Sequence, residues 1–97
     1  MDGLFLFTAL KEKYLWEIQY HDKNSVKNYY PGLCECVSDL FAAEFITFEQ
    51  RQWLILEIYQ DTPDGYGGFM FSITDTQSRI DWLDGKIAEW TFKTEKP

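Results

Sequence analysis

The residues able to do covalent chemistry are few in this sequence: one histidine and two cysteines. Nucleophilic catalysis needs a base within hydrogen-bond reach of the nucleophile, but His21 stands beside Asp22 in a polar segment typical of an exposed surface. Cys34 and Cys36 are separated by one residue, so they fit neither an unstrained disulfide nor the C-x-x-C pattern of redox and zinc sites. We expect two reduced thiols, Cys36 in the core and Cys34 on its flank, and no metal site.

Paired carboxylates are the next candidates for chemistry. Asp61 with Asp64, and Asp81 with Asp84, are the closest pairs that could share acid–base work or hold a cation. A chain with 16 acidic residues among 97 produces such pairs by chance, and it contains no calcium-binding loop motif. We therefore expect a protein that is not an enzyme and carries no cofactor.

Arg79, Trp82 and Lys86 form a candidate binding pattern, because they fall at i, i+3 and i+7 along one flank of a helix. Trp and Arg dominate protein-binding hot spots, and a Trp between two cations can cover a phosphate or a planar ring. The alternative is that Trp82 packs under another element with Arg79 as its polar lid.

A glycine-rich segment could complete such a ligand site through Gly65, Tyr66 and Gly67, with Tyr66 as a stacking group. It lacks the preceding strand and following helix of a phosphate-binding fingerprint, so a turn is the simpler interpretation.

The net charge of the sequence limits the kinds of molecule that the protein is expected to bind. Nine basic residues against 16 acidic ones give a net charge of −7, which argues against direct nucleic-acid binding and against an anionic membrane surface. No run of the sequence reaches the ~18 apolar residues of a membrane span. A basic protein partner is favoured, because opposite charges steer association. The residues expected to contact it are Glu35, Asp39, Glu44 and Glu49, with Tyr66 and Trp82 as aromatic anchors.

Two central helices carry the clearest periodicity. After the Pro31-Gly32 turn, apolar residues at spacings of three and four predict a helix over 33–45 with one buried stripe: Leu33, Cys36, Val37, Leu40, Phe41 and Phe45. Thr47 and Gln50 form a capping box that starts a second helix over 48–60. That helix is apolar around most of its circumference, so it is either central in a bundle or partly covered by a second chain. A loop of one to three residues would make the two an antiparallel pair.

The two ends of the chain are ambiguous between helix and hairpin. A helix starting after Asp2 fits Phe7, Leu10, Tyr14 and Ile18, but residues 14–20 also alternate as a strand would. Residues His21 to Asn28 then form a polar linker. Near the C-terminus, a second capping box at Thr74 and Gln77 precedes helical spacing over 80–90, whereas Asp84-Gly85 is a hairpin signal within 79–92. We favour a helix in both places.

These elements predict one domain over residues 1–97, mainly α-helical, with three or four helices around an aromatic core. Residues 61–68 read as a loop and 69–73 as a short strand or connector. One short β-hairpin fits within this scheme, and an α+β fold is the alternative.

Four short segments between residues 32 and 90 carry a resemblance. They are Gly32-Leu33-Cys34 opening a helix, Leu40 one turn before its end, Ile46-Thr47 with Gln50, and Arg79-Ile80-x-Trp82-Leu83. This pattern resembles small accessory proteins of bacteriophages and prophages, although the long aromatic N-terminal segment and Gly85 depart from it. The resemblance implies no active-site residues for this sequence. It implies an accessory protein of the kind that binds and disables host or defence components.

We therefore expect a small acidic protein that binds and inhibits a basic host or defence protein in the cytoplasm of an infected or lysogenic bacterium. One alternative is an oligomeric protein that binds or sequesters a small anionic ligand such as a nucleotide signal, through Gly65, Tyr66, Gly67, Arg79, Trp82 and Lys86. The other is a structural subunit of a larger assembly, which would form a homo-oligomer through the helix over 48–60.

Overall fold

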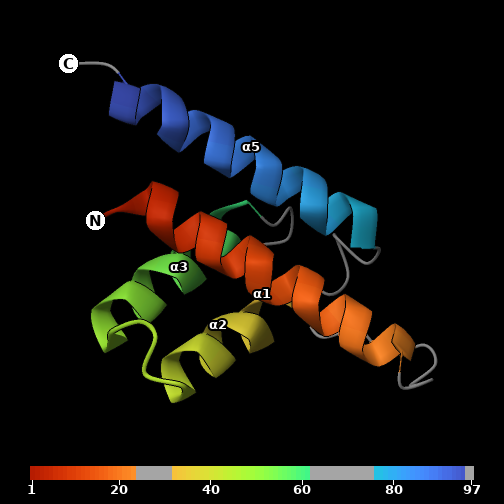
Figure 1. Ribbon diagram of the computed structural model, residues 1–97. Helices are drawn as coiled ribbons and strands as arrows, with labels where there is room; N and C mark the ends of the chain where they lie inside the picture. The colour runs from red at the N-terminus through yellow and green to blue at the C-terminus, as the bar shows by residue number, and fades with distance from the viewer. Residues whose placement is uncertain (24–31, 62–75, 96–97) are drawn as a thin grey trace.

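The computed structural model describes residues 1–23, 32–61 and 76–95, and every regular element within them is an α-helix (Figure 1). The elements are α1 (Gly3–Lys23), α2 (Leu33–Ala42), α3 (Phe48–Gln60) and α5 (Thr76–Glu95). The predicted mainly α-helical bundle is confirmed. Both ambiguous ends are helical, because residues 14–20 belong to α1 and residues 79–92 belong to α5. The predictions for residues 62–75 lie outside the described residues.

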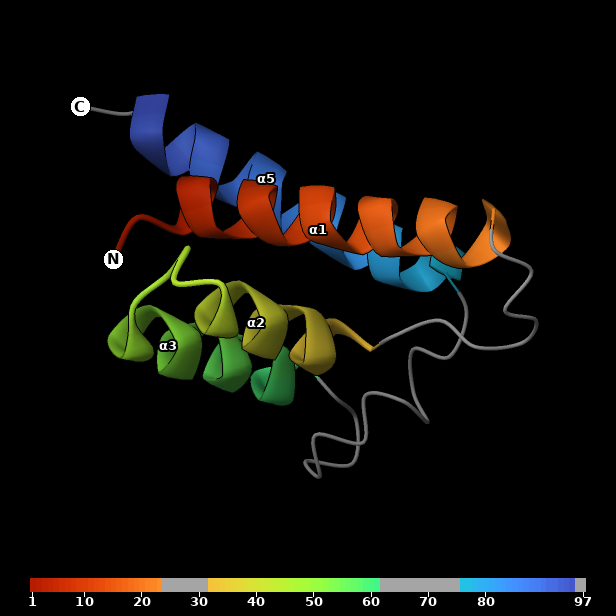
Figure 2. The same ribbon diagram turned by 60° about the horizontal axis from the view of Figure 1, so that its bottom comes forward.

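α1 is the central element of the bundle. In Figure 1 it runs between α5 on one side and the α2–α3 pair on the other, and in Figure 2 α5 crosses behind it while the α2–α3 pair lies below it. Its core side chains, Leu6, Phe7, Leu10 and Tyr14, are fully buried. The ring of Phe7 contacts both Trp53 of α3 and Trp82 of α5. Residues 14–20 also suited a strand because Trp16 and Tyr20 alternate with the other apolar residues, but these two side chains are exposed on α1.

The start of α1 follows the predicted cap. The Phe5 N–H donates to Oδ1 of Asp2 at 3.1 Å, and the Leu6 N–H donates to the Asp2 carbonyl at 3.1 Å. The helix continues to Lys23, so His21 belongs to α1 and not to the predicted polar linker, whose residues from 24 on lie outside the described residues. No glycine or proline lies between Gly3 and Pro31 to end the helix earlier.

The start of α3 is also as predicted. The Gln50 N–H donates to the Thr47 hydroxyl at 3.1 Å, while the Gln50 side chain accepts from the Thr47 N–H at 2.8 Å. These two bonds satisfy backbone donors that a helix start otherwise leaves open. The capping box therefore fixes where the chain turns from α2 into α3.

The end of α2 differs from the prediction. The helix stops at Ala42, and Glu44 adopts a left-handed backbone with φ 60°. The Glu44 N–H donates to the Phe41 carbonyl at 2.9 Å and the Phe45 N–H to the Leu40 carbonyl at 3.0 Å, which is a Schellman termination. Phe45 is therefore outside the helix, and the connection to α3 spans residues 43–47 instead of one to three residues.

α3 is not the central helix that its apolar circumference suggested. Leu54 and Ile58 are buried against the core, whereas Phe48, Leu56 and Tyr59 are exposed. α1 occupies the central position in the bundle that the sequence predicted for α3, and it contacts each of the other described helices. The second half of that expectation, cover by another chain, stays a prediction.

α5 runs through Gly85 without a break. Lys11 of α1 pairs with Asp84 at 2.5 Å beside that glycine, and Trp53 of α3 meets Trp90 edge-on at 5.7 Å between ring centroids. Gln77 donates to Asp81 within α5 at 2.9 Å, while Thr74, the other half of the expected capping box, lies outside the described residues. None of the described helices combines the length and apolarity needed to cross a membrane.

Two glycines in helices should respond oppositely to alanine. A Cβ on Gly85 would meet no atom within 4 Å, so Gly85→Ala should raise the free energy of unfolding by ~1 kcal/mol through helix propensity. A Cβ on Gly3 would lie 2.7 Å from Nε1 of Trp90 and closer still to its ring carbons. Gly3→Ala should therefore lower the free energy of unfolding by about 1–3 kcal/mol. Urea unfolding of the two variants measures both, and equal effects would contradict the packing of Trp90 on α1.

Candidate functional site

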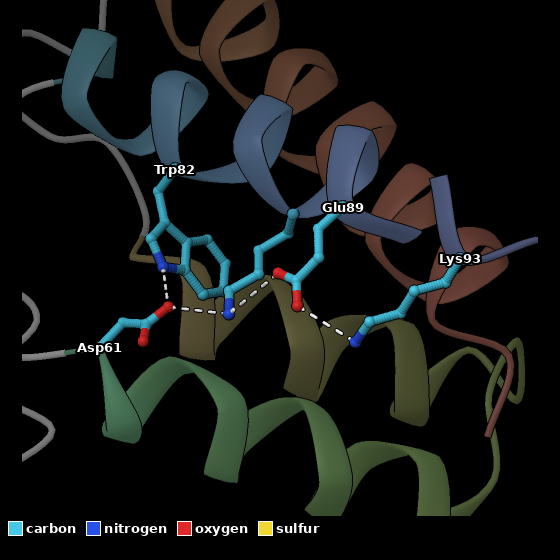
Figure 3. Close-up of polar contacts among 5 residues, drawn as sticks. Asp61, Trp82, Glu89 and Lys93 are labelled. Atoms are coloured by element: carbon cyan, nitrogen blue, oxygen red, sulfur yellow. Dashed lines mark hydrogen bonds and ion pairs between the residues drawn. The ribbon is translucent and has the colours of Figure 1, made fainter. Parts of the chain in front are cut away.

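Trp82 and Lys86, two of the predicted ligand-binding residues, both contact Asp61 at the end of α3 (Figure 3). The Trp82 indole N–H donates to Oδ2 of Asp61 at 2.7 Å, and the Lys86 ammonium lies 3.0 Å from the same oxygen. Lys86 also lies 5.6 Å from the centroid of the Trp82 ring. Further along α5, Glu89 lies 3.9 Å from Lys86 and 3.1 Å from Lys93 (Figure 3). The contacts at Asp61 tie the C-terminal end of α3 to α5.

The contacts at Asp61 change its acidity. Burial alone would raise the pKa of this carboxyl, but the hydrogen bonds from Lys86 and Trp82 favour its charged form and leave the pKa below its ordinary value. The charge of Lys86 is thus compensated within the protein. A small anionic ligand would have to compete with Asp61 for it.

Arg79, the third of these predicted residues, contacts α1. It is 6% exposed, and its guanidinium donates to the Tyr14 hydroxyl on α1 at 3.1 Å. The alternative in which Trp82 packs under another element agrees with the edge-on contact between Trp82 and Phe7 of α1, at 5.6 Å between ring centroids. The role of Arg79 as a polar lid on Trp82 stays a prediction. Gly65, Tyr66 and Gly67, the other residues of the expected ligand site, lie outside the described residues.

The carboxylate pairs do not form a joint site within the part of the chain that the structure describes. Asp81 accepts from Gln77 at 2.9 Å, Asp84 pairs with Lys11, and Asp64 lies outside the described ranges. No group of three metal-ligating side chains occurs among residues 1–23, 32–61 and 76–95.

The two thiols lie where the sequence placed them. Cys36 is fully buried and Cys34 is half-buried, and both are free. Burial raises the pKa of Cys36 to about 12, with a further contribution from the Glu17 carboxylate, and burial also raises the pKa of Cys34. Both thiols are protonated near neutral pH and are poor nucleophiles.

The four acidic residues expected to face a partner are all exposed. Glu35 and Asp39 lie one turn apart on the outer face of α2, Glu44 lies in the connection, and Glu49 lies in the first turn of α3. Glu44 and Glu49 stand directly beside Phe45 and Phe48 in the chain. They bring negative charge to an aromatic surface that the sequence did not reveal.

This surface consists of four exposed phenylalanines, here called the phenylalanine surface: Phe5, Phe41, Phe45 and Phe48. Their exposed fractions are 44%, 37%, 55% and 58%. Phe5 stacks on Phe45 with ring centroids 5.8 Å apart, and Phe41 meets Phe48 edge-on at 6.1 Å. Figure 2 shows the connection between α2 and α3, which includes Phe45, rising toward the first turn of α1, and this agrees with the stacking of Phe45 on Phe5.

Sequence periodicity assigned Phe41 and Phe45 to the buried stripe of the helix over 33–45, and this was wrong. The left-handed residue Glu44 ends the helix between them and turns Phe45 toward Phe5. Periodicity cannot detect such an end, because glycine or asparagine is the usual left-handed residue and glutamate gives no signal. The Thr47-Gln50 capping box was the available clue, since it fixes Phe48 as the first residue of α3.

The charge of Asp61 should contribute to stability in a pH-dependent way. Because its pKa is lowered in the folded protein, the contribution is present above the unfolded value of ~3.9 and is lost as the pH falls through the folded value. Asp61→Asn should lower the free energy of unfolding by about 0.5–1.5 kcal/mol at neutral pH and by much less at low pH.

Urea unfolding at neutral pH and near pH ~3 measures this difference. Asp39→Asn, at an exposed position of α2, is the control and should change little at either pH. A loss for Asp61→Asn that is the same at both pH values would show that charge is not its cause.

Comparison with known proteins gives no relative from which a function could be carried over. No family model matches the chain, and neither a curated protein nor a solved structure matches it. The candidate site therefore stands on its own geometry: an exposed phenylalanine surface with glutamates beside it, at the end of the bundle where α1 begins.

Proposed function

We propose that this protein is a small, acidic, non-enzymatic binding domain that docks on a basic surface of another protein through the phenylalanine surface and Glu44 and Glu49. The observation that carries the proposal is the presence of two pairs of exposed aromatic rings, Phe5 with Phe45 and Phe41 with Phe48, at the connection between α2 and α3. Large exposed apolar patches with polar residues beside them are typical of interaction sites.

The phenylalanine surface is large enough to form the apolar centre of a protein interface, but not the whole interface. A phenylalanine side chain can bury on the order of 150–250 Å², so four rings about half exposed supply roughly 300–500 Å² of apolar area. A standard interface covers about 800 Å² on each partner, with aromatic anchors at its centre and polar residues at its rim. Glu44 and Glu49 would belong to that rim and steer a basic partner toward the rings.

The backbone of Glu44 supports the proposal independently. A left-handed conformation costs a residue with a side chain roughly 1–2 kcal/mol, a cost that glycine avoids. The Glu44 side chain is exposed and makes no hydrogen bond or ion pair with the described residues; the backbone N–H of Glu44 donates only to the Phe41 carbonyl at the helix end. A strained, charged residue between two exposed aromatic rings is typical of a functional surface.

The resemblance to phage accessory proteins gives the proposal its finer form. It implies that docking inhibits a host or defence protein in the bacterial cytoplasm, with Glu35 and Asp39 extending the negative field along α2. The small-ligand alternative has no comparable support in the described residues. Its Lys86 is paired with Asp61, and its Arg79 is buried.

Capture of partners by variant chains tests this function. The immobilised wild-type chain should enrich a basic protein from a lysate of its natural host, and Phe45→Ala with Phe48→Ala should reduce that enrichment at least about tenfold, because hot-spot rings cost more than ~1–2 kcal/mol when truncated. Phe92→Ala removes a ring that is 61% exposed on α5 and is the matched control. Equal capture by all three chains would contradict the proposal.

Glu44→Gly separates binding from folding in the same experiment. This variant should be more stable to urea by about 1 kcal/mol, since glycine adopts the left-handed backbone without strain. It should nevertheless bind the captured partner several-fold more weakly, because it removes a rim charge. A variant that is stabilised and binds as well as the wild type would show that Glu44 takes no part in docking.

A second candidate function, a subunit of a larger assembly, is favoured by the outer face of α3. Phe48, Leu56 and Tyr59 lie along one side of the helix with Gln52 between them, and all four are exposed. An uncharged apolar stripe of this kind suits a contact with a second copy, because a net charge of −7 would otherwise keep two chains apart.

Sedimentation velocity distinguishes this candidate. If the stripe joins two copies, the wild-type chain should form a dimer at micromolar concentration, and Leu56→Lys should make it monomeric by placing a charge in the contact. A wild-type chain that is monomeric throughout that range would exclude the assembly function and leave the docking function untouched.

A further inference from the structure

A groove lies directly beside the phenylalanine surface, along the first turns of α1. Its volume is about 380 Å³, within the range of sites that hold small molecules or single side chains. Leu4, Phe5, Ala9 and Phe45 supply its apolar walls, while Asp2 and Glu12 supply carboxylates. The groove thus combines an apolar interior with negative charge and contains no basic residue among those that line it.

Glu12 carries a charge that the described residues do not neutralise. Its two lysine neighbours in the chain are engaged elsewhere: Lys11 pairs with Asp84 at 2.5 Å and Lys13 pairs with Glu17 at 2.7 Å. Glu12 itself is exposed and makes no ion pair with residues 1–23, 32–61 or 76–95. A cation entering the groove would therefore find a carboxylate without a competing partner.

The stacked rings of Phe5 and Phe45 are a second feature of the groove that would favour a cation. At the surface, lysine and arginine side chains of this protein lie against aromatic rings, 4.5–5.7 Å from the ring centroids. The stacked pair of Phe5 and Phe45 has no such cation within the part of the chain that the structure describes. These surface contacts are Lys13 with Trp16, Arg51 with Phe41, Lys86 with Trp82, and Lys93 with Trp90, while a further contact, Arg79 with Tyr14 at 5.9 Å, is buried.

We infer that this groove binds an arginine side chain presented by the partner protein. The aliphatic stem of arginine suits the Leu4 and Ala9 walls, and its guanidinium can lie on a phenylalanine ring while donating to the Glu12 carboxylate. Lysine fits less well, because its compact ammonium is more strongly hydrated and has no planar face to stack. The inference rests on the proposed function and names the residue type that the basic partner inserts.

The test uses the isolated chain and a minimal probe. In ¹⁵N NMR spectra, N-acetyl-arginine amide should shift the backbone amides of Leu4, Ala9 and Phe45 and reach saturation at millimolar concentration. N-acetyl-citrulline amide has the same shape without the charge and should leave these amides in place. Citrulline shifts equal to those from arginine, or arginine shifts confined to other parts of the chain, would overturn the inference.

Two substitutions locate the contact. Glu12→Gln keeps the shape of an exposed side chain and should weaken arginine binding at least about threefold, and Phe5→Ala should do so by a similar factor. Glu57→Gln on α3 is the matched control for charge and should bind as the wild type does. Since Phe5→Ala also removes a packing ring, the conservative Glu12→Gln variant decides the outcome: unchanged binding by it would overturn the inference.

The same variants separate this inference from the function on which it rests. If the captured partner is lost with Phe45→Ala and Phe48→Ala but retained in full by Glu12→Gln, the docking function stands and the arginine contact is overturned. If arginine amide binds the groove while partner capture is indifferent to Phe45 and Phe48, the docking function is overturned. If Phe45→Ala with Phe48→Ala abolishes partner capture, and Glu12→Gln weakens both arginine binding and partner capture, the docking function and the arginine contact are both supported.

Discussion

The fold depends on burying one side-chain row of α1, formed by Leu6, Phe7, Leu10 and Tyr14, against helices on opposite sides. These four side chains are fully removed from solvent, and burying a large apolar side chain is worth about 1.5–3 kcal/mol each. α2, α3 and α5 are arranged around this row, and each of them contacts α1 (Figure 1). Because α1 fills the centre, the outer side of α3 remains exposed.

Polar contacts between the helices use much of the positive charge of the described residues. Arg79 donates to Tyr14, Lys86 pairs with Asp61, and Lys11 pairs with Asp84. Each of these contacts joins α5 to α1 or to the end of α3. The carboxylates left over, Glu12 and Glu44 among them, therefore set the charge of the outer surface, and they lie beside the rings of the phenylalanine surface. The same interactions that hold the bundle together leave that end of it aromatic and with more acidic than basic side chains, although Arg51 lies against Phe41.

Local physical chemistry explains which predictions from the sequence succeeded. The Asp2 cap and the Thr47-Gln50 capping box act over three residues, so their bonds could be predicted from the chain alone and are present. The position of Cys36 in the core follows from helical spacing in the same way. The binding pattern of Arg79, Trp82 and Lys86 could not be judged locally. Whether those side chains face a ligand depends on Tyr14 and Asp61, which lie on other helices.

The sequence by itself determined the helical class, the starts of α1 and α3 and the negative net charge, because each depends on neighbouring residues or on composition. Only the tertiary structure decided which aromatic residues stay in water. Phe7 and Phe5 are two residues apart, but one is fully buried between Trp53 and Trp82 and the other is 44% exposed. Burial of a ring depends on what distant segments bring against it, and the left-handed turn at Glu44 brings Phe45 to Phe5 without covering either ring.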